Sequence, residues 1–322
     1  MSDPNASVSA AAPETVETET YRGSSLPPEP TADKPRSLWS DAWRELRSSK
    51  IFILSGILIF VFLIMTFFPS LLTFGKDPYT CDLTLSRQGP SSTAWFGYDN
   101  NGCDVYTRTI YGAKASILVG VFATAFTMLV GGFIGVIAGF FGGWVDSILS
   151  RLTDIFFGIP LLLGGILVLS SFPASDSTNL YGEVGKVVLA LGILGWTSMT
   201  RIMRSSVIQV RNADFVIAAR ALGASSGRII RKHVVPNSLA PLIVVATISL
   251  GGYIGAEATL SFLGLGLQPP VISWGTMIND AQPYIRVAPF MLFFPAIFLS
   301  VAVLSFIMLG DAVREALDPK LR

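Results

Sequence analysis

The chain has 322 residues, of which 51% are hydrophobic and only 14% are charged. A soluble domain of this length would carry roughly 25% charged residues, so the composition favours a protein with several membrane-spanning segments. The formal net charge of +1 gives no reason to expect a nucleic-acid partner, and the placement of the charges says more than their sum.

The first 36 residues are rich in Pro, Ser, Thr and Glu and poor in large apolar residues. A segment of this composition cannot bury enough apolar surface to fold, so residues 1–36 are predicted to be a disordered tail. They lack the early basic region and the apolar stretch of a signal peptide.

Residues 37–50, "SLWSDAWRELRSSK", precede the first apolar stretch. Their apolar residues recur at helical spacing: Leu38, Trp39, Ala42, Trp43 and Leu46. This pattern favours an amphipathic helix lying in the cytoplasmic membrane interface. The alternative is an N-terminal extension of the first span.

Six stretches approach the roughly 20 apolar residues that a helix needs to cross a bilayer. The predicted spans are Ile51–Phe74, Ser116–Phe141, Leu152–Phe172, Val187–Met203, Leu239–Leu260 and Ala288–Gly310. The fourth is the weakest, because it is short and contains Gly192, Gly195 and Trp196. The chain is therefore predicted to be an all-α membrane protein with six transmembrane helices.

An even number of spans puts both termini on the same side of the membrane. Most of the 23 lysines and arginines fall in the segments on that side. By the positive-inside rule, both termini, the segment 204–237 and the C-terminal tail 311–322 are cytoplasmic. The segment 75–115 is then a long external loop, and residues 116–310 form the core.

Four glycines in the second span repeat at every fourth position: Gly131, Gly135, Gly139 and Gly143. They form one stripe of small residues, on which a second helix can pack closely. The pattern fits internal packing and a subunit interface equally well.

The only two cysteines, Cys81 and Cys103, both fall in the predicted external loop. Disulfides persist on the oxidising side of a membrane, so the pattern favours a Cys81–Cys103 bridge, with two free thiols as the alternative. Two cysteines without neighbouring histidines make a poor zinc site, and no metal site is predicted.

Catalytic motifs are largely missing. No G-x-x-x-x-G-K-[ST] phosphate loop occurs, and His233 is the single histidine, so H-E-x-x-H is excluded. The stretch 223–227 fits G-x-S-x-G, but that motif requires a strand before it and a helix after it, and the neighbours here are helical spans.

Glu257 is the most unusual carboxylate, because it lies inside the fifth predicted span near its outer end. An acidic residue in a span should face the bundle interior, a partner or water. Glu257 is a candidate for the translocation path; the alternative is a hydrogen-bonded residue that holds helices together.

The stretch "AARALGASSGRIIRKHVVPN" (218–237) is basic, contains glycines and separates two spans. It resembles the cytoplasmic coupling motif of ABC-transporter permeases, written EAA, three residues, Gly, nine residues, I-x-L-P. Ala218, Ala219, Gly223 and Pro236 match its spacing. Ile217 stands at the usual Glu position, and His233 and Val235 replace Ile and Leu. Asp214 is close enough to supply the missing carboxylate.

Three further stretches narrow the resemblance: "WFGYDNNGCDVYTRTIYGAKASILVG" (95–120), "LSFLGLGLQPPVISWGTMI" (260–278) and "GDAVREALDPKLR" (310–322). In the first, Cys103 takes a position at which the peptide permeases commonly have Arg. Together these stretches resemble the "C" permease of oligopeptide and dipeptide ABC importers over most of residues 37–322. The permease of nickel importers is a close relative of that group.

The resemblance implies the transmembrane-domain fold of type I ABC importers and a permease without catalytic activity of its own. It also implies a short coupling helix that docks on the ATPase. The residues that would make this contact are Asp214, Phe215, Ala218, Ala219, Arg220, Ala221, Leu222 and Gly223. Gly223, directly after the helix, would end it as a C′ glycine.

The implied partners are a sister permease, two ATPase subunits or one fused ATPase, an extracytoplasmic peptide-binding protein, a peptide substrate and membrane lipid. No cofactor is expected in this subunit, because ATP and Mg would be bound by the ATPases. The implied location is the cell membrane.

Three alternatives remain at this point. A permease for nickel or another small solute would look similar. A secondary transporter would show internal repeats and broken helices with midplane charges, and the sequence has no convincing repeat and no central ionisable pair. An intramembrane enzyme would need a nucleophile and a base inside a span, and none is found.

Overall fold

The computed structural model describes residues 38–172 and 179–317. In these ranges the chain is built from helices, and its only β pairing is two isolated bridges, Cys81–Cys103 and Tyr98–Asp104. The predicted tail 1–36 lies outside the described residues. Part of the predicted tail 311–322 is helical, because the last helix continues to Leu317.

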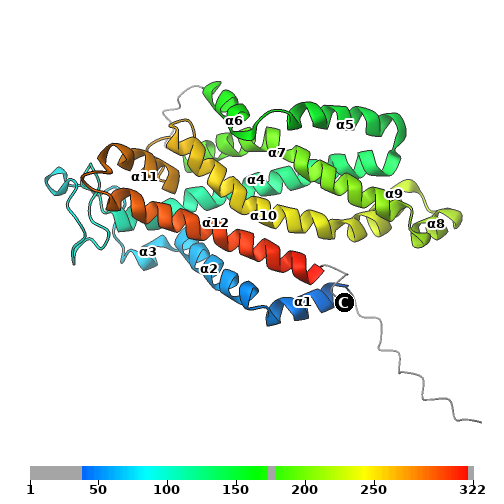
Figure 1. Cartoon of the computed structure of the whole chain (residues 1–322), viewed down its shortest axis with the longest axis horizontal. Coiled ribbons are helices and arrows are strands. Elements are labelled where there is room, and N and C mark those ends of the chain that lie inside the picture. Colours follow the sequence, from blue (N-terminus) through cyan, green and yellow to red (C-terminus); the bar gives the residue numbers. More distant parts are fainter. Residues whose placement is uncertain (1–37, 173–178, 318–322) are drawn as a thin grey trace, which may run out of the picture. The chain divides into compact units, whose positions relative to one another are not determined.

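The helices follow one another in a simple order (Figure 1). They are α1 (Leu38–Ser48), α2 (Lys50–Phe67), α3 (Pro69–Leu72), η1 (Leu83–Leu85), α4 (Val105–Phe141), α5 (Gly143–Phe157), α6 (Leu161–Ser170), α7 (Leu180–Arg211), α8 (Asp214–Ala221), α9 (Ser226–Ile229), η2 (Ile230–Val234), α10 (Val235–Phe262), α11 (Trp274–Ala281), η3 (Gln282–Tyr284) and α12 (Phe290–Leu317).

Within residues 38–172 and 179–317, five helices are long and apolar enough to cross a membrane: α2, α4, α7, the unit of residues 226–262 that contains α10, and α12. The pair α5 and α6 makes a sixth crossing if it is counted as one span. This agrees with the all-α prediction of six spans.

The third predicted span, Leu152–Phe172, is not one straight helix. It is divided between α5 and α6, whose axes are bent by 82° at a short break. The cause lies in the sequence at the break. Pro160 has no N–H to donate, and its ring disfavours the helical conformation at Ile159. The chain therefore leaves the helix after Phe157 and starts a new one at Leu161.

The fourth predicted span proved longer than the apolar stretch 187–203. Helix α7 runs for 32 residues without a break. Its glycines serve as contact points, because a Cβ on Gly192 would meet the ring of Phe126 and one on Gly195 would meet Tyr253 and Thr127. The two glycines therefore allow close helix packing and do not interrupt the span.

The glycine stripe of α4 faces α7. A Cβ on Gly135 would lie 2.7 Å from the Cβ of Met203, and one on Gly139 would lie 2.9 Å from the Cβ of Val207. Gly131 is equally close to Met199. Gly143 is not part of this contact, because it lies beyond the end of α4 in open space. For the first three glycines, the stripe is internal packing.

Trp274 fastens helix α11 to the bundle. Its side chain is fully buried, its Nε1 donates to the carbonyl of Thr109 at 2.9 Å, and its ring meets the ring of Phe62 edge-on at 5.7 Å. One tryptophan thus joins α11 to both α4 and α2.

Short helix α1 is separated from α2 at Ser49, whose hydroxyl accepts a hydrogen bond from the N–H of Phe52. Trp43 packs edge-on against Phe52, with ring centroids 6.2 Å apart. Residues 38–48 thus form a helix of their own rather than a continuous extension of the first span. Its location in the membrane interface stays a prediction.

Figure 1 shows that α3, α11 and the segment before α4 gather at one end of the bundle. Helices α1, α8 and α9 and the end of α12 gather at the opposite end. The two ends of the described chain therefore lie on the same side, as an even number of crossings requires.

Candidate functional site

The predicted coupling helix is a separate element. Helix α8 follows α7 after two residues and lies at the end of the bundle in Figure 1. Its single fully buried side chain, Val216, packs in a cluster with Val207, Ile229 and Val234. One apolar anchor therefore fixes α8 to the base of α7 and to the turn that leads into α10.

Gly223 ends this helix in the predicted conformation. Its φ of +79° is in the left-handed region, which glycine adopts without a steric penalty. The N–H of Gly223 donates to the carbonyl of Arg220 at 3.0 Å, and the N–H of Ala224 donates to that of Ala219 at 3.1 Å. This pair of bonds is the Schellman motif, with Gly223 at C′.

Most of the predicted coupling residues are exposed. Asp214, Phe215, Ala218, Arg220, Ala221, Leu222 and Gly223 are open to the surroundings, and Ala219 is half-buried. Leu222 is 88% exposed and Phe215 is 46% exposed. A cluster of exposed apolar side chains next to charged ones is typical of a protein-binding surface.

Ile217 and His233 extend this surface. Ile217, which the sequence prediction did not include, is 54% exposed and adds to the apolar patch. Asp214 lies three residues before Ile217 and therefore on the same side of the helix. His233 is half-buried, and its ring lies 6.3 Å from that of Phe215. That Asp214 replaces the usual Glu stays a prediction.

The segment after α8 leads into the next span through a widened helical turn. Ser225 is the N-cap residue of α9, and η2 makes π-type turns before α10 starts at Val235. The basic side chains Arg228, Arg231 and Lys232 are exposed. Ser225 lies in a turn between two helices, so the G-x-S-x-G stretch does not have the strand that a nucleophile elbow needs.

Glu257, on α10, is fully buried and faces the N-terminal half of α4. The hydroxyl of Ser261 donates to its Oε1 at 2.8 Å, and the hydroxyls of Ser116 and Ser273 lie beside the carboxyl group. These contacts favour the structural alternative, in which Glu257 connects helices. A role on the translocation path stays a prediction.

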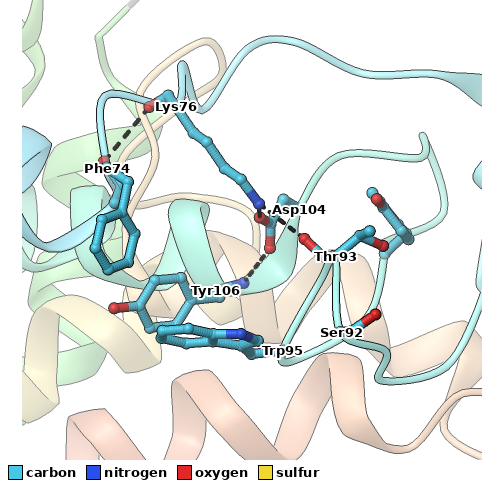
Figure 2. Close-up of a pocket in the computed structure, with 9 residues that line it drawn as sticks. Phe74, Lys76, Ser92, Thr93, Trp95, Asp104 and Tyr106 are labelled. Carbon is cyan, nitrogen blue, oxygen red and sulfur yellow. Dashed lines mark hydrogen bonds and ion pairs between the residues drawn. The ribbon is translucent and has the colours of Figure 1, made fainter.

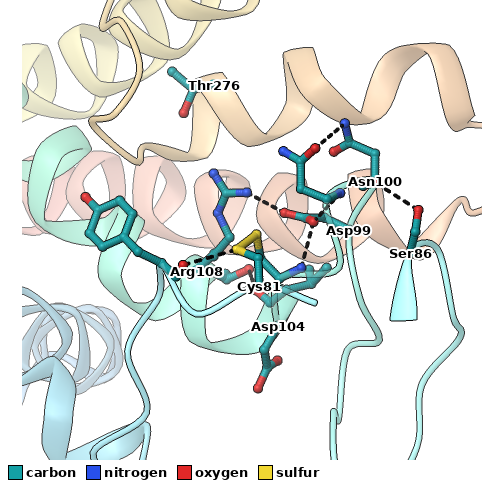
Figure 3. Close-up of polar contacts among 12 residues, drawn as sticks. Cys81, Ser86, Asp99, Asn100, Asp104, Arg108 and Thr276 are labelled. Carbon is teal, nitrogen blue, oxygen red and sulfur yellow. Dashed lines mark hydrogen bonds and ion pairs between the residues drawn. A yellow bond between two sulfur atoms is a disulfide. The ribbon is translucent and has the colours of Figure 1, made fainter. Parts of the chain in front are cut away.

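Cys81 and Cys103 are joined in a disulfide, as predicted. Figure 3 shows the bond beside the Asp99 carboxylate, which organises the same turn. The Oδ1 of Asp99 accepts hydrogen bonds from the N–H groups of Asn101, at 2.8 Å, and Cys103, at 2.9 Å. The Arg108 guanidinium of α4 pairs with Oδ2 of the same residue.

Arg108 also faces α11. Burial raises the pKa of the half-buried Asp280 on that helix, and the Arg108 charge partly offsets the shift. Asp82, at the start of η1, has a pKa below its usual range because the Thr84 hydroxyl and N–H both donate to it. The segment before α4 is therefore held by charges as well as by the disulfide. We refer to residues 73–104, most of which fall in the predicted external loop, as the external cap.

The external cap and the first turn of α4 enclose a pocket of about 540 Å³ (Figure 2). Its aromatic side comes from Phe74, Trp95 and Tyr106, and the Trp95 and Tyr106 rings are 4.9 Å apart. Its polar side comes from Lys76, whose ammonium group lies 3.0 Å from the Asp104 carboxylate. The pocket lies at the opposite end of the bundle from α8.

These features define a class of protein: a multi-pass membrane protein with a short helix exposed at one end and a disulfide-linked cap at the other. Residues 131–322 match the family described as the binding-protein-dependent transport system inner membrane component. Residues 37–90 match the N-terminal TM domain of oligopeptide transport permease C.

Similar proteins cover nearly the whole chain. The dipeptide transport system permease protein DppC of Alkalihalophilus pseudofirmus is 38% identical over 92% of this chain and 97% of its own. The oligopeptide transport system permease protein OppC of Bacillus subtilis is 39% identical over 91% and 93%. The glutathione transport system permease protein GsiD of Pectobacterium atrosepticum is 31% identical over 89% and 93%.

Among solved structures, a chain of the inward-facing MetNI methionine ABC transporter has a TM-score of 0.52 at 19% identity. The match covers 65% of this chain and 96% of that chain. The likeness shows the fold, which is that of the membrane domain of type I ABC importers.

The chain belongs to the family of inner membrane components of binding-protein-dependent transport systems. It is a permease subunit without catalytic activity, and membership implies that an ATPase and other subunits complete the transporter.

Proposed function

We propose that this chain forms half of the membrane pathway of an ATP-driven importer of oligopeptides or dipeptides. The observation that carries the proposal is the identity of 38% and 39% to permeases named for dipeptide and oligopeptide transport, over more than nine tenths of the chain. The exposed, capped helix α8 supports the ATP-driven mechanism, because it offers a compact surface to a cytoplasmic partner.

In this proposal a sister permease forms the other half of the pathway. Two ATPase subunits, or one fused ATPase, bind ATP and Mg and contact α8, so the permease itself holds no cofactor. An extracytoplasmic binding protein delivers the peptide to the end that carries the external cap. The chain then resides in the cell membrane with both termini in the cytoplasm.

ATP-driven closure of the ATPase dimer moves α8 and switches the pathway between inward- and outward-facing states. The physical basis is a two-state membrane domain that ligands bias from both ends. Val216 and its apolar neighbours support this role, because they attach α8 to α7 and to the turn before α10. A displacement of α8 is thereby passed to two spans at once.

The test is co-purification of the complete complex from native membranes through a tag on this chain. We expect the ATPase and a sister permease to be recovered, and Leu222→Asp to reduce recovery of the ATPase but not of the sister permease. Recovery of the chain alone, under conditions that preserve other membrane complexes, would contradict the proposal.

A further inference from the structure

Helix α7 carries charges unusually close together for a membrane span. Between Lys186 and Arg201, residues 187–200 are uncharged, and at 1.5 Å per residue they cover about 21 Å. The hydrocarbon layer is roughly 30 Å thick. At least one of the flanking charges therefore lies at the depth of the hydrocarbon layer.

Arg201 lies deep within the bundle relative to its cytoplasmic end. The guanidinium of Arg211, at the end of α7, donates to the carbonyl of Gly139 near the end of α4, at 2.7 Å. Arg201 precedes Arg211 by three helical turns, or about 15 Å along the axis. It is therefore well inside the level at which α4 ends.

Arg201 forms an open ion pair with Asp154 of α5. Its Nη2 donates to the Asp154 Oδ1 at 2.7 Å, and its guanidinium carbon lies 3.8 Å from the ring centre of Phe157. The two charged side chains are 46% and 58% exposed. Charged side chains inside spans face water or protein, because exposure to lipid is costly.

The rest of this face of α7 is polar. Ser198, Ser205 and Gln209 are exposed and lie at helical spacing from Arg201. By contrast, the exposed side chains of α4 are apolar; they include Phe122, Phe126, Leu129 and Phe133. The polar face of α7 is therefore suited to contact with water, and the apolar face of α4 is suited to contact with lipid.

A groove lies beside the ion pair. A pocket of about 310 Å³ is lined by several residues within 156–161 at the break between α5 and α6, within 194–198 of α7 and within 249–253 of α10. Gly252 opens its α10 side, because a Cβ there would meet no atom within 4 Å. The groove thus combines an apolar wall with hydroxyl groups and a nearby pair of opposite charges.

We propose that Arg201 and Asp154 lie on the translocation pathway and bind the two termini of a peptide in succession as it passes through this groove. Arg201 binds the C-terminal carboxylate, and Asp154 binds the N-terminal ammonium group. The proposal rests on the proposed function, whose substrate is zwitterionic. An exposed ion pair contributes little to stability, so the two side chains exchange each other for the peptide termini at low cost.

A second ion pair on the same two helices serves as a structural comparison. Arg204 donates to Asp146 through Nε and through Nη2, the latter at 2.7 Å, and these side chains are only 36% and 20% exposed. This doubly bonded pair connects α7 to α5 one turn closer to the cytoplasm. It is the matched control for Arg201 and Asp154.

The first test asks whether the groove is filled with water. Both cysteines of the sequence are bridged, so a new cysteine is the only free thiol of this chain. In the complete transporter, with unmodified transporter as background, Ser198→Cys should react with a small charged thiol reagent. Peptide together with the binding protein should slow the reaction.

Phe133→Cys is the control at equal depth, because Gly131 and Gly135 on either side of it pack against residues 196–204 of α7. It should remain unreactive. If Ser198→Cys is as unreactive as Phe133→Cys, the groove faces lipid or a neighbouring subunit, and the proposal is wrong.

The second test asks whether the pair reads the peptide termini. Uptake by reconstituted transporter is compared for one peptide with a free C-terminus and for its C-terminal amide, and the binding protein's affinity for each is measured separately. After the uptake is corrected for that affinity, the preference for the peptide with a free C-terminal carboxylate should be several-fold smaller in Arg201→Gln than in the unmodified transporter. Asp154→Asn should likewise have a smaller preference for the free over the acetylated N-terminus.

Arg204→Gln should lower the uptake of both peptides in equal proportion. Unchanged preferences in Arg201→Gln and Asp154→Asn, in transporter that still takes up peptide, would overturn the assignment. Absence of peptide uptake by the unmodified transporter would instead contradict the proposed function, so the two failures are distinguishable.

Discussion

At the residue scale, Gly223 is the position where backbone geometry and proposed function meet most closely. The residue needs a positive φ to end α8, and its surroundings are open, so a side chain would meet no steric obstacle in space. The constraint is therefore purely conformational. A residue other than glycine would change the direction of the chain after α8 without disturbing the packing of the spans.

We expect Gly223→Val to cost roughly 1–2 kcal/mol locally, because a β-branched residue disfavours the left-handed region. Assembly in the membrane should survive, while peptide uptake and substrate-stimulated ATP hydrolysis in reconstituted vesicles should fall sharply. Ser225→Ala, two residues away, should behave as the unmodified protein. Full uptake by Gly223→Val would show that this turn does not transmit the motion of the ATPase.

The disulfide is expected to stabilise the external cap. Cys81 and Cys103 close a loop with a sequence separation of 22, and the chain-entropy model gives about 3 kcal/mol for a loop of that length. Replacing both with Ser should make the external cap susceptible to protease added outside the cell, while the spans stay protected. Equal protease resistance with and without the bridge would show that the Asp99–Arg108 pair holds the cap by itself.

At the scale of elements, the contact between α4 and α7 organises the bundle. Gly131, Gly135 and Gly139 bring the backbones of the two helices together, and Met199, Met203 and Val207 fill the spaces between them. Lipid offers no hydrophobic driving force between helices, so close contact of small residues is a main source of association. The stripe is therefore a structural feature of the chain and not a free surface.

Gly135→Ala should consequently destabilise the protein by about 1–3 kcal/mol through overpacking. The added Cβ would lie 2.7 Å from the backbone oxygen of Thr200, which cannot move independently of α7. Gly56→Ala in α2 is the control, because no atom lies within 4 Å of its Cβ position. The thermal unfolding midpoint of the detergent-solubilised protein measures both; equal midpoints would refute this account of the stripe.

Hydrophobic patterning predicted the class of fold and the approximate positions of the spans, because each crossing must be apolar over most of its length. It did not predict the break in the third span, although Pro160 carried the signal, since apolar residues continue on both sides of it. It also placed the start of the second span at Ser116. The helix in fact begins at Val105, where Asp104 caps it. Hydrophobic patterning missed this start because the first turns of the helix contain many polar residues.

Helix α8 could be predicted from the sequence, whereas the polar face of α7 could not. Local rules were sufficient for α8, because a short helix followed by Gly223 is encoded within ten residues of sequence. The polar face of α7 was not found, because Arg201 and Asp154 are 47 residues apart in sequence. Their pairing depends on how α5 folds back along α7, which no local pattern contains.

At the scale of the whole molecule, the two ends of the bundle differ in chemistry. The end with α8 carries the exposed basic residues Arg228, Arg231 and Lys232, and the other end carries the disulfide. The positive-inside rule and the redox difference across a membrane both predict that the first end is cytoplasmic. Two independent arguments thus lead to the same orientation.

Thiol labelling of intact cells tests that orientation. Ser91→Cys, exposed on the external cap, should react with a membrane-impermeant reagent without further treatment. Ser226→Cys, exposed at the start of α9, should react only after the membrane is permeabilised. The reverse pattern would invert the orientation and remove α8 from the reach of a cytoplasmic ATPase.

In the proposed function, this chain converts ATP hydrolysis by a partner into peptide movement. The most direct measurement is peptide uptake into vesicles that contain this chain, its sister permease and the ATPase, with the binding protein outside and ATP inside. We predict uptake that requires every component and stops when this chain is omitted or when ATP is replaced by a non-hydrolysable analogue. Uptake that continues without the ATPase and follows an imposed proton or sodium gradient would contradict the claim.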